Sequence, residues 1–348
     1  MAEPTLAELT TLRVGGPARR VLTPSSEAEL IEAVAGCDAA GEPVLVVGGG
    51  SNLLVGDAGF DGTVVLTAGV RGIERDEVTG CGGAVLQVAA GEPWDAFVAD
   101  CVAQEFVGVE ALSGIPGLAG ATPIQNVGAY GQEVSQTIAS VRVWDRQEGR
   151  VRTFFSSECG FGYRTSVFKR EPGRHLVLTV TFQLTLGPRS APIRYGELAR
   201  RLGVAAGERA PLGQVRDTVL DLRRGKGMVL DSSDHDTWSA GSFFTNPILT
   251  ADQAAGLPAE APRFPAGSGD DLVKTSAAWL IEHAGFGKGY GTPPATLSTK
   301  HTLALTNRGG ATSADLARLA REIRDGVEAR FGVRLVPEPV LVGVSLDS

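Results

Sequence analysis

The chain has 348 residues, 43% hydrophobic and 21% charged, which excludes large-scale disorder and predicts two or three domains. Its net charge of -8 argues against a sequence-independent nucleic-acid binder, since that role requires many Lys and Arg side chains against phosphates. Four cysteines (Cys37, Cys81, Cys101 and Cys159) lie far apart without CxxC spacing, so neither a disulfide framework nor a metal site is indicated.

The first residues lack both the basic and the apolar segment of a signal peptide. No apolar run reaches the length of a membrane span. We therefore expect a cytoplasmic protein that has no membrane partner.

The N-terminal part predicts a small β-α-β unit. A short strand is expected around Val21, and a helix is expected to begin at the capping pair Ser26 and Glu29. The apolar residues 44–47 then predict a buried strand, and a second strand is expected at 63–66 with no helix between them.

A glycine loop follows the strand at 44–47 directly, and its residues are Gly48, Gly49, Gly50, Ser51 and Asn52. Consecutive glycines expose backbone N–H groups and let a bulky anion approach, so the loop is a candidate pyrophosphate cradle. A Rossmann site would need a sixth-position glycine and an immediate helix, but Leu53 and a turn stand there. A dinucleotide here would be held by loop amides in a fold that is not doubly wound. A plain glycine-rich connection remains the alternative.

The next segment predicts a strand at 84–88 and a helix after Pro93. Helical spacing of the apolar residues places Trp94 and Cys101 in the core rather than in a site.

Residues 108–131 hold a second concentration of glycine and proline. Such a run is unlikely to form a regular element, and long ordered loops in compact domains are usually functional. A flexible linker is the alternative, although the embedded Ile115, Leu118 and Tyr130 favour an ordered loop.

Alternating patterns at 140–144 and 176–186 predict strands of an antiparallel sheet, and a polar stretch suggests a domain boundary near residue 227. Beyond it we expect a helix near 276–284 and a strand at 303–305.

A long helix should begin at the capping pair Thr312 and Asp315 and end at Gly332, before a final strand.

Six motifs together point to one family, and they occur in this order: TLRVGGPA (11–18), VVGGGSNLLV (46–55), GIPGLAGATPIQNVGAYG (114–131), FGYRTSVFK (161–169), SAGSFFTNP (239–247) and PEPVLVG (337–343). On these motifs the chain closely resembles the UDP-N-acetylenolpyruvoylglucosamine reductase family, over nearly its whole length. Tyr195, in RYGEL, suggests the type with an extra loop that folds over the nucleotide.

The resemblance implies an α+β protein with the FAD-binding fold of the vanillyl-alcohol-oxidase (PCMH) type and a C-terminal α+β substrate domain. It implies two FAD-binding subdomains, at 1–68 and 69–226, and a substrate-binding domain at 227–348. It also implies residues that bind FAD: Gly48, Gly49, Gly50, Ser51, Asn52, Leu53, Ile115, Pro116, Thr122, Ile124, Gln125, Gly128, Ala129 and Tyr130.

The same resemblance implies that Arg164, Ser242 and Glu338 are catalytic. Residues expected to bind the substrate's diphosphate or uridine are Tyr195, Arg223, Lys226, Asn246, Lys274 and His283. No metal is implied.

The implied reaction is reduction of the enolpyruvyl ether of UDP-N-acetylglucosamine to UDP-N-acetylmuramate, with NADPH as hydride donor. FAD N5 would deliver hydride to the vinyl C3, Ser242 would supply the proton to C2, and Arg164 and Glu338 would stabilise the enolate. The only partner expected is the small-molecule substrate, and the chain is expected to be a monomer. Two alternatives stay open: another oxidase of the same FAD fold, and a non-catalytic protein that binds a nucleotide sugar.

Overall fold

The structure, a computed structural model, describes residues 5–80, 82–266 and 272–347, so Cys81 lies outside the described residues. The chain folds into two compact units. Unit 1 comprises Met1–Ala18, Gly50–Phe60 and Gly225–Ser348, and unit 2 comprises Arg19–Gly49 and Asp61–Arg224. The expected boundary near residue 227 lies close to the start of the last segment of unit 1, while the division at 68 and 226 into three domains stays a prediction.

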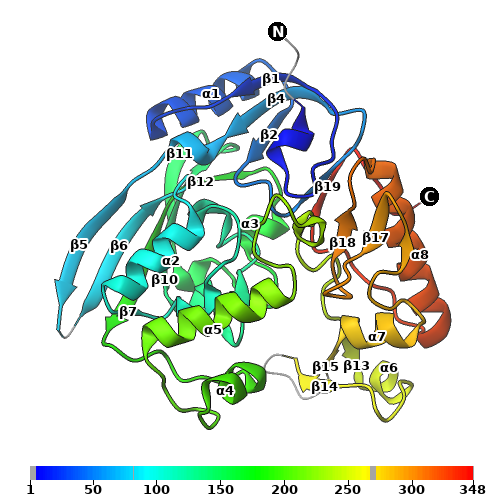
Figure 1. Cartoon of the computed structure of the whole chain (residues 1–348). Coiled ribbons are helices and arrows are strands. Elements are labelled where there is room, and N and C mark those ends of the chain that lie inside the picture. Colours follow the sequence, from blue (N-terminus) through cyan, green and yellow to red (C-terminus); the bar gives the residue numbers. More distant parts are fainter. Residues whose placement is uncertain (1–4, 81, 267–271, 348) are drawn as a thin grey trace. The chain divides into compact units, whose positions relative to one another are not determined.

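The large sheet of unit 2 is antiparallel, as the alternating pattern predicts (Figure 1). Its strand order is β11-β10-β12-β6-β5, and β7 pairs with β12. The strands are β5 (Ile73–Thr79), β6 (Gly83–Ala89), β7 (Phe106–Val107), β10 (Ile138–Asp145), β11 (Arg150–Phe155) and β12 (His175–Leu186).

A second, three-stranded sheet has the order β1-β4-β2. Its strands are β1 (Ala18–Leu22), β2 (Val44–Val47) and β4 (Phe60–Leu66), and α1 (Glu27–Ala39) connects β1 to β2. Ser26 caps α1 by accepting a hydrogen bond from the Glu29 amide at 3.2 Å. The predicted β-α-β unit is confirmed, with β4 lying between its two strands and parallel to β2.

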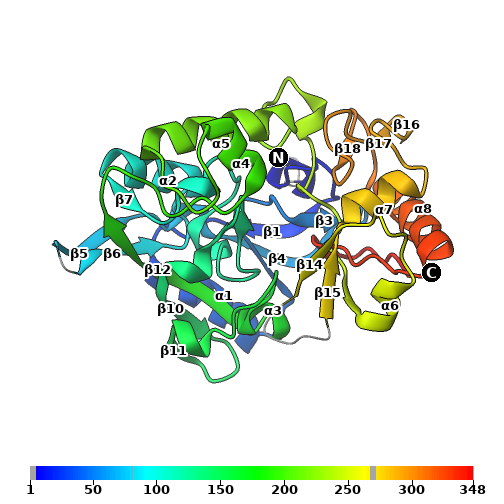
Figure 2. The ribbon, with the colours of Figure 1, turned by 90° about the horizontal axis from the view of Figure 1, so that it is seen from below.

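Helix α2 (Trp94–Ala103) packs on the large sheet. The ring centroids of Trp94 and Phe97 lie 5.8 and 5.1 Å from that of Phe182 on β12, and Cys101 is buried, so the core assignment of Trp94 and Cys101 is confirmed. Helix α5 (Leu212–Gly225), which no pattern above predicts, lies beside α2 in both views (Figures 1 and 2). The smaller elements of unit 2 are α3 (Val167–Arg170), α4 (Gly196–Leu202), β8 (Gly128–Ala129) and β9 (Gln132–Glu133).

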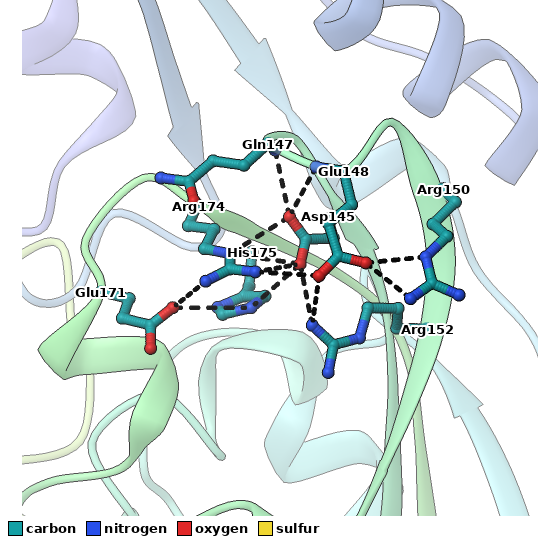
Figure 3. A network of polar contacts seen from close by, with 8 residues as sticks. All are labelled: Asp145, Gln147, Glu148, Arg150, Arg152, Glu171, Arg174 and His175. Atoms are coloured by element: carbon teal, nitrogen blue, oxygen red, sulfur yellow. Dashed lines mark hydrogen bonds and ion pairs between the residues drawn. The ribbon is translucent and has the colours of Figure 1, made fainter.

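A polar network closes one end of the large sheet (Figure 3). Asp145, the last residue of β10, is buried and accepts hydrogen bonds from Arg174, Arg152 and the amides of Gln147 and Glu148. The Arg174 contacts, above all, hold the pKa of Asp145 well below its usual range. The network therefore ties β10, β11 and β12 together through charge as well as through their ladders.

Unit 1 contains two small antiparallel sheets and one parallel strand pair. The strands are β13 (Ile248–Thr250), β14 (Arg263–Pro265) and β15 (Leu272–Thr275) in the first sheet, β16 (Gly291–Thr292), β17 (Ala295–Leu297) and β18 (Leu305–Asn307) in the second, and β3 (Leu53–Val55) with β19 (Val340–Val342) in the pair. Among its described residues, the α-helices are α6 (Ala251–Ala255), α7 (Ala277–His283) and α8 (Ser313–Phe331). Helices α7 and α8 lie side by side, and α8 packs on β17 and β18 (Figures 1 and 2).

The C-terminal predictions hold, apart from one strand. The α8 capping box of Thr312 and Asp315 is present, and Gly332 ends the helix with φ +67°. The strand expected around 303–305 is present but starts two residues later, because residues 301–304 form a turn in which the Ala304 amide donates to the carbonyl of His301 at 3.2 Å. Strand β18 begins only at Leu305.

Candidate active site

The two glycine-rich segments meet in unit 2. Gly48 and Gly49 follow β2, and a Cβ added to Gly49 would lie only 2.7 Å from the Cα of Gly117. A Cβ on Gly48 would stand 3.8 Å from side-chain atoms of Leu118 and Ala121, an ordinary contact distance. A side chain at position 49 would push the two segments apart, so their shared surface depends on bare backbone.

The end of the first glycine segment belongs to unit 1. Gly50 has φ +61°, and its Cβ would lie 1.7 Å from the carbonyl oxygen of Leu9, so only glycine fits. The Gly50 carbonyl accepts a hydrogen bond from the Thr11 amide at 3.1 Å, and Asn52 Nδ2 donates to the Glu338 carbonyl at 3.3 Å. The predicted FAD residues of this segment thus divide into Gly48 and Gly49 in unit 2 and Gly50, Ser51, Asn52 and Leu53 in unit 1.

The second glycine-rich segment is ordered by backbone hydrogen bonds. The amides of Ala119 and Gly120 donate to the carbonyls of Glu92 and Ala90 at 2.9 and 3.0 Å. These bonds rule out the flexible-linker alternative. The remaining predicted FAD residues all lie on this segment: Ile115, Pro116, Thr122, Ile124, Gln125, Gly128, Ala129 and Tyr130.

Asp95, on the first turn of α2, fixes the start of this segment. Its Oδ1 accepts a hydrogen bond from the Gly114 amide at 2.6 Å. The guanidinium of Arg216 on α5 donates to Oδ1 and Oδ2 at 2.7 and 2.9 Å. Burial alone would raise the pKa of Asp95, but the contacts with Arg216 and Gly114 lower it on balance. Asp95 therefore stays ionised and holds α2, α5 and the glycine segment together.

Arg164 stands on a tight turn that aims it at the second glycine segment. The amides and carbonyls of Gly162 and Thr165 bond to each other across the turn at 3.1 and 3.3 Å. Arg164 itself has φ +53°, a region that residues with side chains rarely occupy and that clusters at functional sites. Its Nη2 donates to the Gly128 carbonyl at 2.7 Å, so the structure brings a predicted catalytic residue to a predicted FAD residue.

Tyr130 lies close to two predicted substrate-binding residues within unit 2. The ring of Tyr195 meets that of Tyr130 edge to face, with centroids 5.4 Å apart. Burial lowers the pKa of the Arg223 guanidinium, while the nearby Tyr130 and Asp95 act in the opposite direction. The structure thus gathers Tyr130, Tyr195 and Arg223 into one neighbourhood.

Ser242 and Glu338 lie on neighbouring segments of unit 1. The Glu338 amide donates to the carbonyl of Phe243 at 2.8 Å, and Phe244 bridges antiparallel to Pro337. Phe243 and Phe244 are each 1% exposed and anchor the segment in the core. Arg164 belongs to unit 2.

The other predicted substrate residues are spread over unit 1. Asn246 Oδ1 accepts a hydrogen bond from the Ala277 amide at 3.0 Å, at the start of α7, and Lys274 lies on β15 opposite Ile248. Lys226 directly follows α5.

His283, the last residue of α7, is exposed and stacks on Trp279 with ring centroids 3.8 Å apart. This ring contact is a packing role that the sequence did not suggest.

Sequence reasoning missed three residues that order the site: Thr11, Asp95 and Arg216. Thr11 stands inside a motif quoted above, but nothing in that motif names its partners. Asp95 and Arg216 are 121 positions apart, and no spacing rule relates them.

Comparison with known proteins matches two families in succession. Residues 18–154 match the FAD binding domain family, and residues 233–342 match the family described as UDP-N-acetylenolpyruvoylglucosamine reductase, C-terminal domain. The chain is 59% identical to the UDP-N-acetylenolpyruvoylglucosamine reductase of Cutibacterium acnes, over 98% of this chain and 90% of that protein. The chain belongs to the UDP-N-acetylenolpyruvoylglucosamine reductase family.

Further relatives agree with this assignment. The protein of the same name from Streptomyces coelicolor is 58% identical over 98% of this chain and 90% of its own length. The crystal structure of the Thermus caldophilus enzyme is 25% identical, covers 97% of each chain and superposes with a TM-score of 0.66. The predicted fold, an FAD-binding fold of the vanillyl-alcohol-oxidase type with a C-terminal α+β domain, is confirmed.

The chain is therefore an oxidoreductase with FAD as its cofactor, and the family uses NADPH as the reductant, as predicted. In the part of the chain that the structure describes, no helix is both long and apolar enough to cross a membrane.

Proposed function

We propose that this chain reduces the enolpyruvyl ether of UDP-N-acetylglucosamine to UDP-N-acetylmuramate, a step in the synthesis of peptidoglycan precursors. The observation that carries the proposal is the contact of the two glycine segments, with Arg164 hydrogen-bonded to one of them at Gly128. The family membership supplies the reaction class, and the chain's own residues supply the roles below.

The residues present fit FAD. The Gly49–Gly117 contact leaves no room for a side chain, and the main chain around it can face a pyrophosphate. Ile115 and Ile124, partly buried beside the core of unit 2, offer an apolar wall for a flat ring. When bound, FAD would supply the hydride that adds to the vinyl C3 of the substrate, having received it from NADPH.

Arg164 would stabilise the negative charge that develops on the substrate carboxylate. A guanidinium is always protonated, and its planar fork matches a carboxylate. Its bond to the Gly128 carbonyl and its strained turn fix the group in advance, so little reorganisation is needed during the reaction. One such contact is worth about 3 kcal/mol of barrier lowering.

Ser242 would donate the proton to C2. A hydroxyl is a weak acid in water, so this role requires a carbanion held close to it and an ordered backbone. The buried Phe243 and Phe244 and the pairing with residues 337–338 provide that order. Glu338, on the adjacent segment, would hold the carboxylate end of the substrate in register with Ser242 through a bridging water, since two ionised carboxylates in direct contact repel each other.

The substrate nucleotide would be held by cations, amides and rings. Predicted contacts are Tyr195 and Arg223 beside Tyr130, and Lys226, Asn246, Lys274 and His283 in unit 1. Tyr195 is 41% exposed and begins the short helix α4, which suits a residue that closes over a ligand.

Further expectations remain part of the proposal. We propose subdomains at 1–68 and 69–226 and a substrate domain at 227–348. We also propose a cytoplasmic monomer that has no nucleic-acid or membrane partner and supports cell shape and division through the cell wall.

The test is anaerobic spectroscopy of the purified protein. We expect a yellow protein that NADPH bleaches and that the enolpyruvyl nucleotide, but not a simple alcohol, restores to yellow. Bleaching of the oxidised protein by an alcohol, or fast reoxidation of the reduced protein by oxygen, would indicate another oxidase of this fold. A protein that stays colourless after FAD is added would indicate a non-catalytic binding protein.

A further inference from the structure

Thr11 makes two hydrogen bonds in unit 1, and each ends on a segment that the proposed reaction uses. Its amide donates to the carbonyl of Gly50 at 3.1 Å. Its Oγ1 donates to the carbonyl of Ser239 at 2.6 Å, and Ser239 lies three positions before Ser242. One residue thus links the first glycine segment to the segment of the proposed proton donor.

The Gly50 end of this link is rigid. Gly50 takes a left-handed backbone with φ +61°, and the carbonyl of Leu9 fills the place of a side chain. The glycine segment is therefore packed against the N-terminal segment that carries Thr11, and the Thr11 amide bond fixes its register.

Besides its pairing with residues 337–338, the Ser242 segment is held from two further sides. On one side, the Asn307 amide donates to the Trp238 carbonyl at 3.0 Å, and the Phe243 amide donates to the Leu303 carbonyl at 2.7 Å. These bonds fix the segment to β18 and the turn before it. On the other side, Thr11 Oγ1 connects it to the glycine segment.

The segment that carries Thr11 is itself held in place by packing and hydrogen bonds. Leu12 is fully buried, and Asn307 Nδ2 donates to the carbonyls of Leu12 and Arg13 at 3.1 and 3.3 Å. The Arg13 guanidinium lies 3.8 Å from the ring centroid of Trp238. A change at the Thr11 hydroxyl should therefore release the Ser242 segment rather than the N-terminal segment.

We infer that Thr11 is a positioning residue that sets the Ser242 segment in register with the first glycine segment. It acts through Ser239 and does not touch reacting atoms. This inference rests on the roles proposed above for Ser242 and for residues 48–52. Misplacement of a reacting group by about 1 Å can slow a reaction by about 10²-fold, so a single hydrogen bond of this kind can matter for the rate.

The experiment compares Thr11→Val and Thr11→Ser in the FAD-loaded protein. Valine keeps the shape of the side chain and the hydrogen bond from the residue 11 amide to Gly50, but it loses the hydroxyl donor. Serine keeps the hydroxyl donor. We expect T11V to be reduced by NADPH at the unaltered rate but reoxidised by the enolpyruvyl nucleotide about 10-fold to 10²-fold more slowly. T11S should reoxidise at nearly the unaltered rate. Thr11→Ala replaces T11V, with the same expectation, if T11V does not fold.

The matched control is Thr10→Val. Thr10 is buried, and its Oγ1 donates to the carbonyl of Val14 at 3.1 Å, within the N-terminal segment. T10V loses a comparable bond without touching the Ser242 segment, so both half-reactions should be unaltered. Hydrogen exchange gives a second readout: amides of residues 238–246 should exchange faster in T11V than in T10V.

Three outcomes would overturn the inference: equal slowing in T11V and T10V, no recovery in T11S, or equal slowing of both half-reactions in T11V. Unchanged exchange at 238–246 in T11V would also overturn it. Failure of the proposed function looks different, because the unaltered protein would then not be reoxidised by the enolpyruvyl nucleotide. If the unaltered protein is reoxidised and T11V matches it, only the role of Thr11 fails.

Discussion

Gly49 has no side chain in a place where the Gly117 backbone occupies the space that a Cβ would need. We predict that Gly49→Ala weakens FAD binding by about 1–3 kcal/mol, because the methyl group forces the two glycine segments apart. The measurement is the FAD dissociation constant, obtained from the change in flavin fluorescence as FAD-free protein is titrated with FAD.

Gly36→Ala is the matched control for this change. Gly36 lies in α1, and nothing lies within 4 Å of where its Cβ would be. It should leave FAD binding unchanged and stabilise the protein by about 0.5–1 kcal/mol, since alanine is the better helix former. Equal FAD affinity in G49A and the unaltered protein would contradict the cradle assigned to Gly48 and Gly49.

Arg164 offers a second prediction, because lysine would keep the positive charge but lose the planar set of donors that can bind both oxygens of a carboxylate. We expect Arg164→Lys to slow reoxidation by the enolpyruvyl nucleotide about 10²-fold, through loss of a preorganised donor, and to leave reduction by NADPH nearly unchanged. Stopped-flow absorbance of the two half-reactions measures both rates.

Arg170→Lys tests whether the effect belongs to position 164. Arg170 is an exposed arginine on the same stretch of chain, and it donates to the carbonyl of Gly160 at 3.1 Å. It should behave like the unaltered protein in both half-reactions. A slow R170K, or a fast R164K, would argue against the carboxylate role of Arg164.

Among the elements, those with local signals could be predicted from the sequence. The capping pairs Ser26 with Glu29 and Thr312 with Asp315 mark real helix starts, because a cap is formed within four residues of the chain. The start of the strand expected around 303–305 was misplaced by two residues, because an apolar run alone does not say which residues pair with a neighbouring strand. Here the carbonyl of Leu303 accepts the Phe243 amide, and the pairing with β17 begins only at Leu305.

The polar network at the end of β10 supports a prediction about pH. Hydrogen bonds from Arg174 lower the pKa of Asp145 below its unfolded value, with Arg152 and two amides in support and burial opposing. The stability that this carboxylate contributes is therefore complete above about pH 4, the usual range of an aspartate, and is lost as pH falls below it.

We expect Asp145→Asn to lower the free energy of unfolding at pH 7, with the difference from the unaltered protein shrinking as pH falls below about 4. Urea unfolding between pH 7 and pH 3 measures it. Asp61→Asn is the control: Asp61 pairs with Arg19 at the exposed surface, where ion pairs contribute little. A difference for D145N that stays constant across this range would contradict the role of the charge.

For the whole molecule, the fold class and the cofactor could be predicted from the family motifs. Which segments of the chain belong to the same unit could not be predicted from the sequence. The chain crosses between the two units several times, so residues 5–18 and 50–60 pack with the C-terminal part. Contacts between segments this far apart, such as Thr11 with Ser239 across 228 positions, have no local signature. This is why Ser242 and Glu338 could be named from motifs, but their pairing through Phe243 could not.

Removal of FAD should destabilise the whole protein. A ligand that binds only the folded state stabilises it by about 2.7 kcal/mol at a free concentration 100-fold above its dissociation constant. We predict a lower melting temperature for the stripped protein and full recovery on adding FAD. FMN, which has no pyrophosphate for the glycine segments, should restore less. Equal melting temperatures with and without FAD would argue against a site built from both segments.

In the proposed reaction, this chain's own residues act on the enolpyruvyl substrate, with Ser242 as proton donor. The most direct measurement is the rate of each half-reaction in Ser242→Ala, beside Ser345→Ala as a control at an exposed serine of unit 1. We predict that S242A is reduced by NADPH at the unaltered rate and reoxidised by the enolpyruvyl nucleotide about 10²-fold or more slowly, while S345A is unaltered in both. Equal slowing of the two half-reactions in S242A, or no slowing of reoxidation, would contradict the claim.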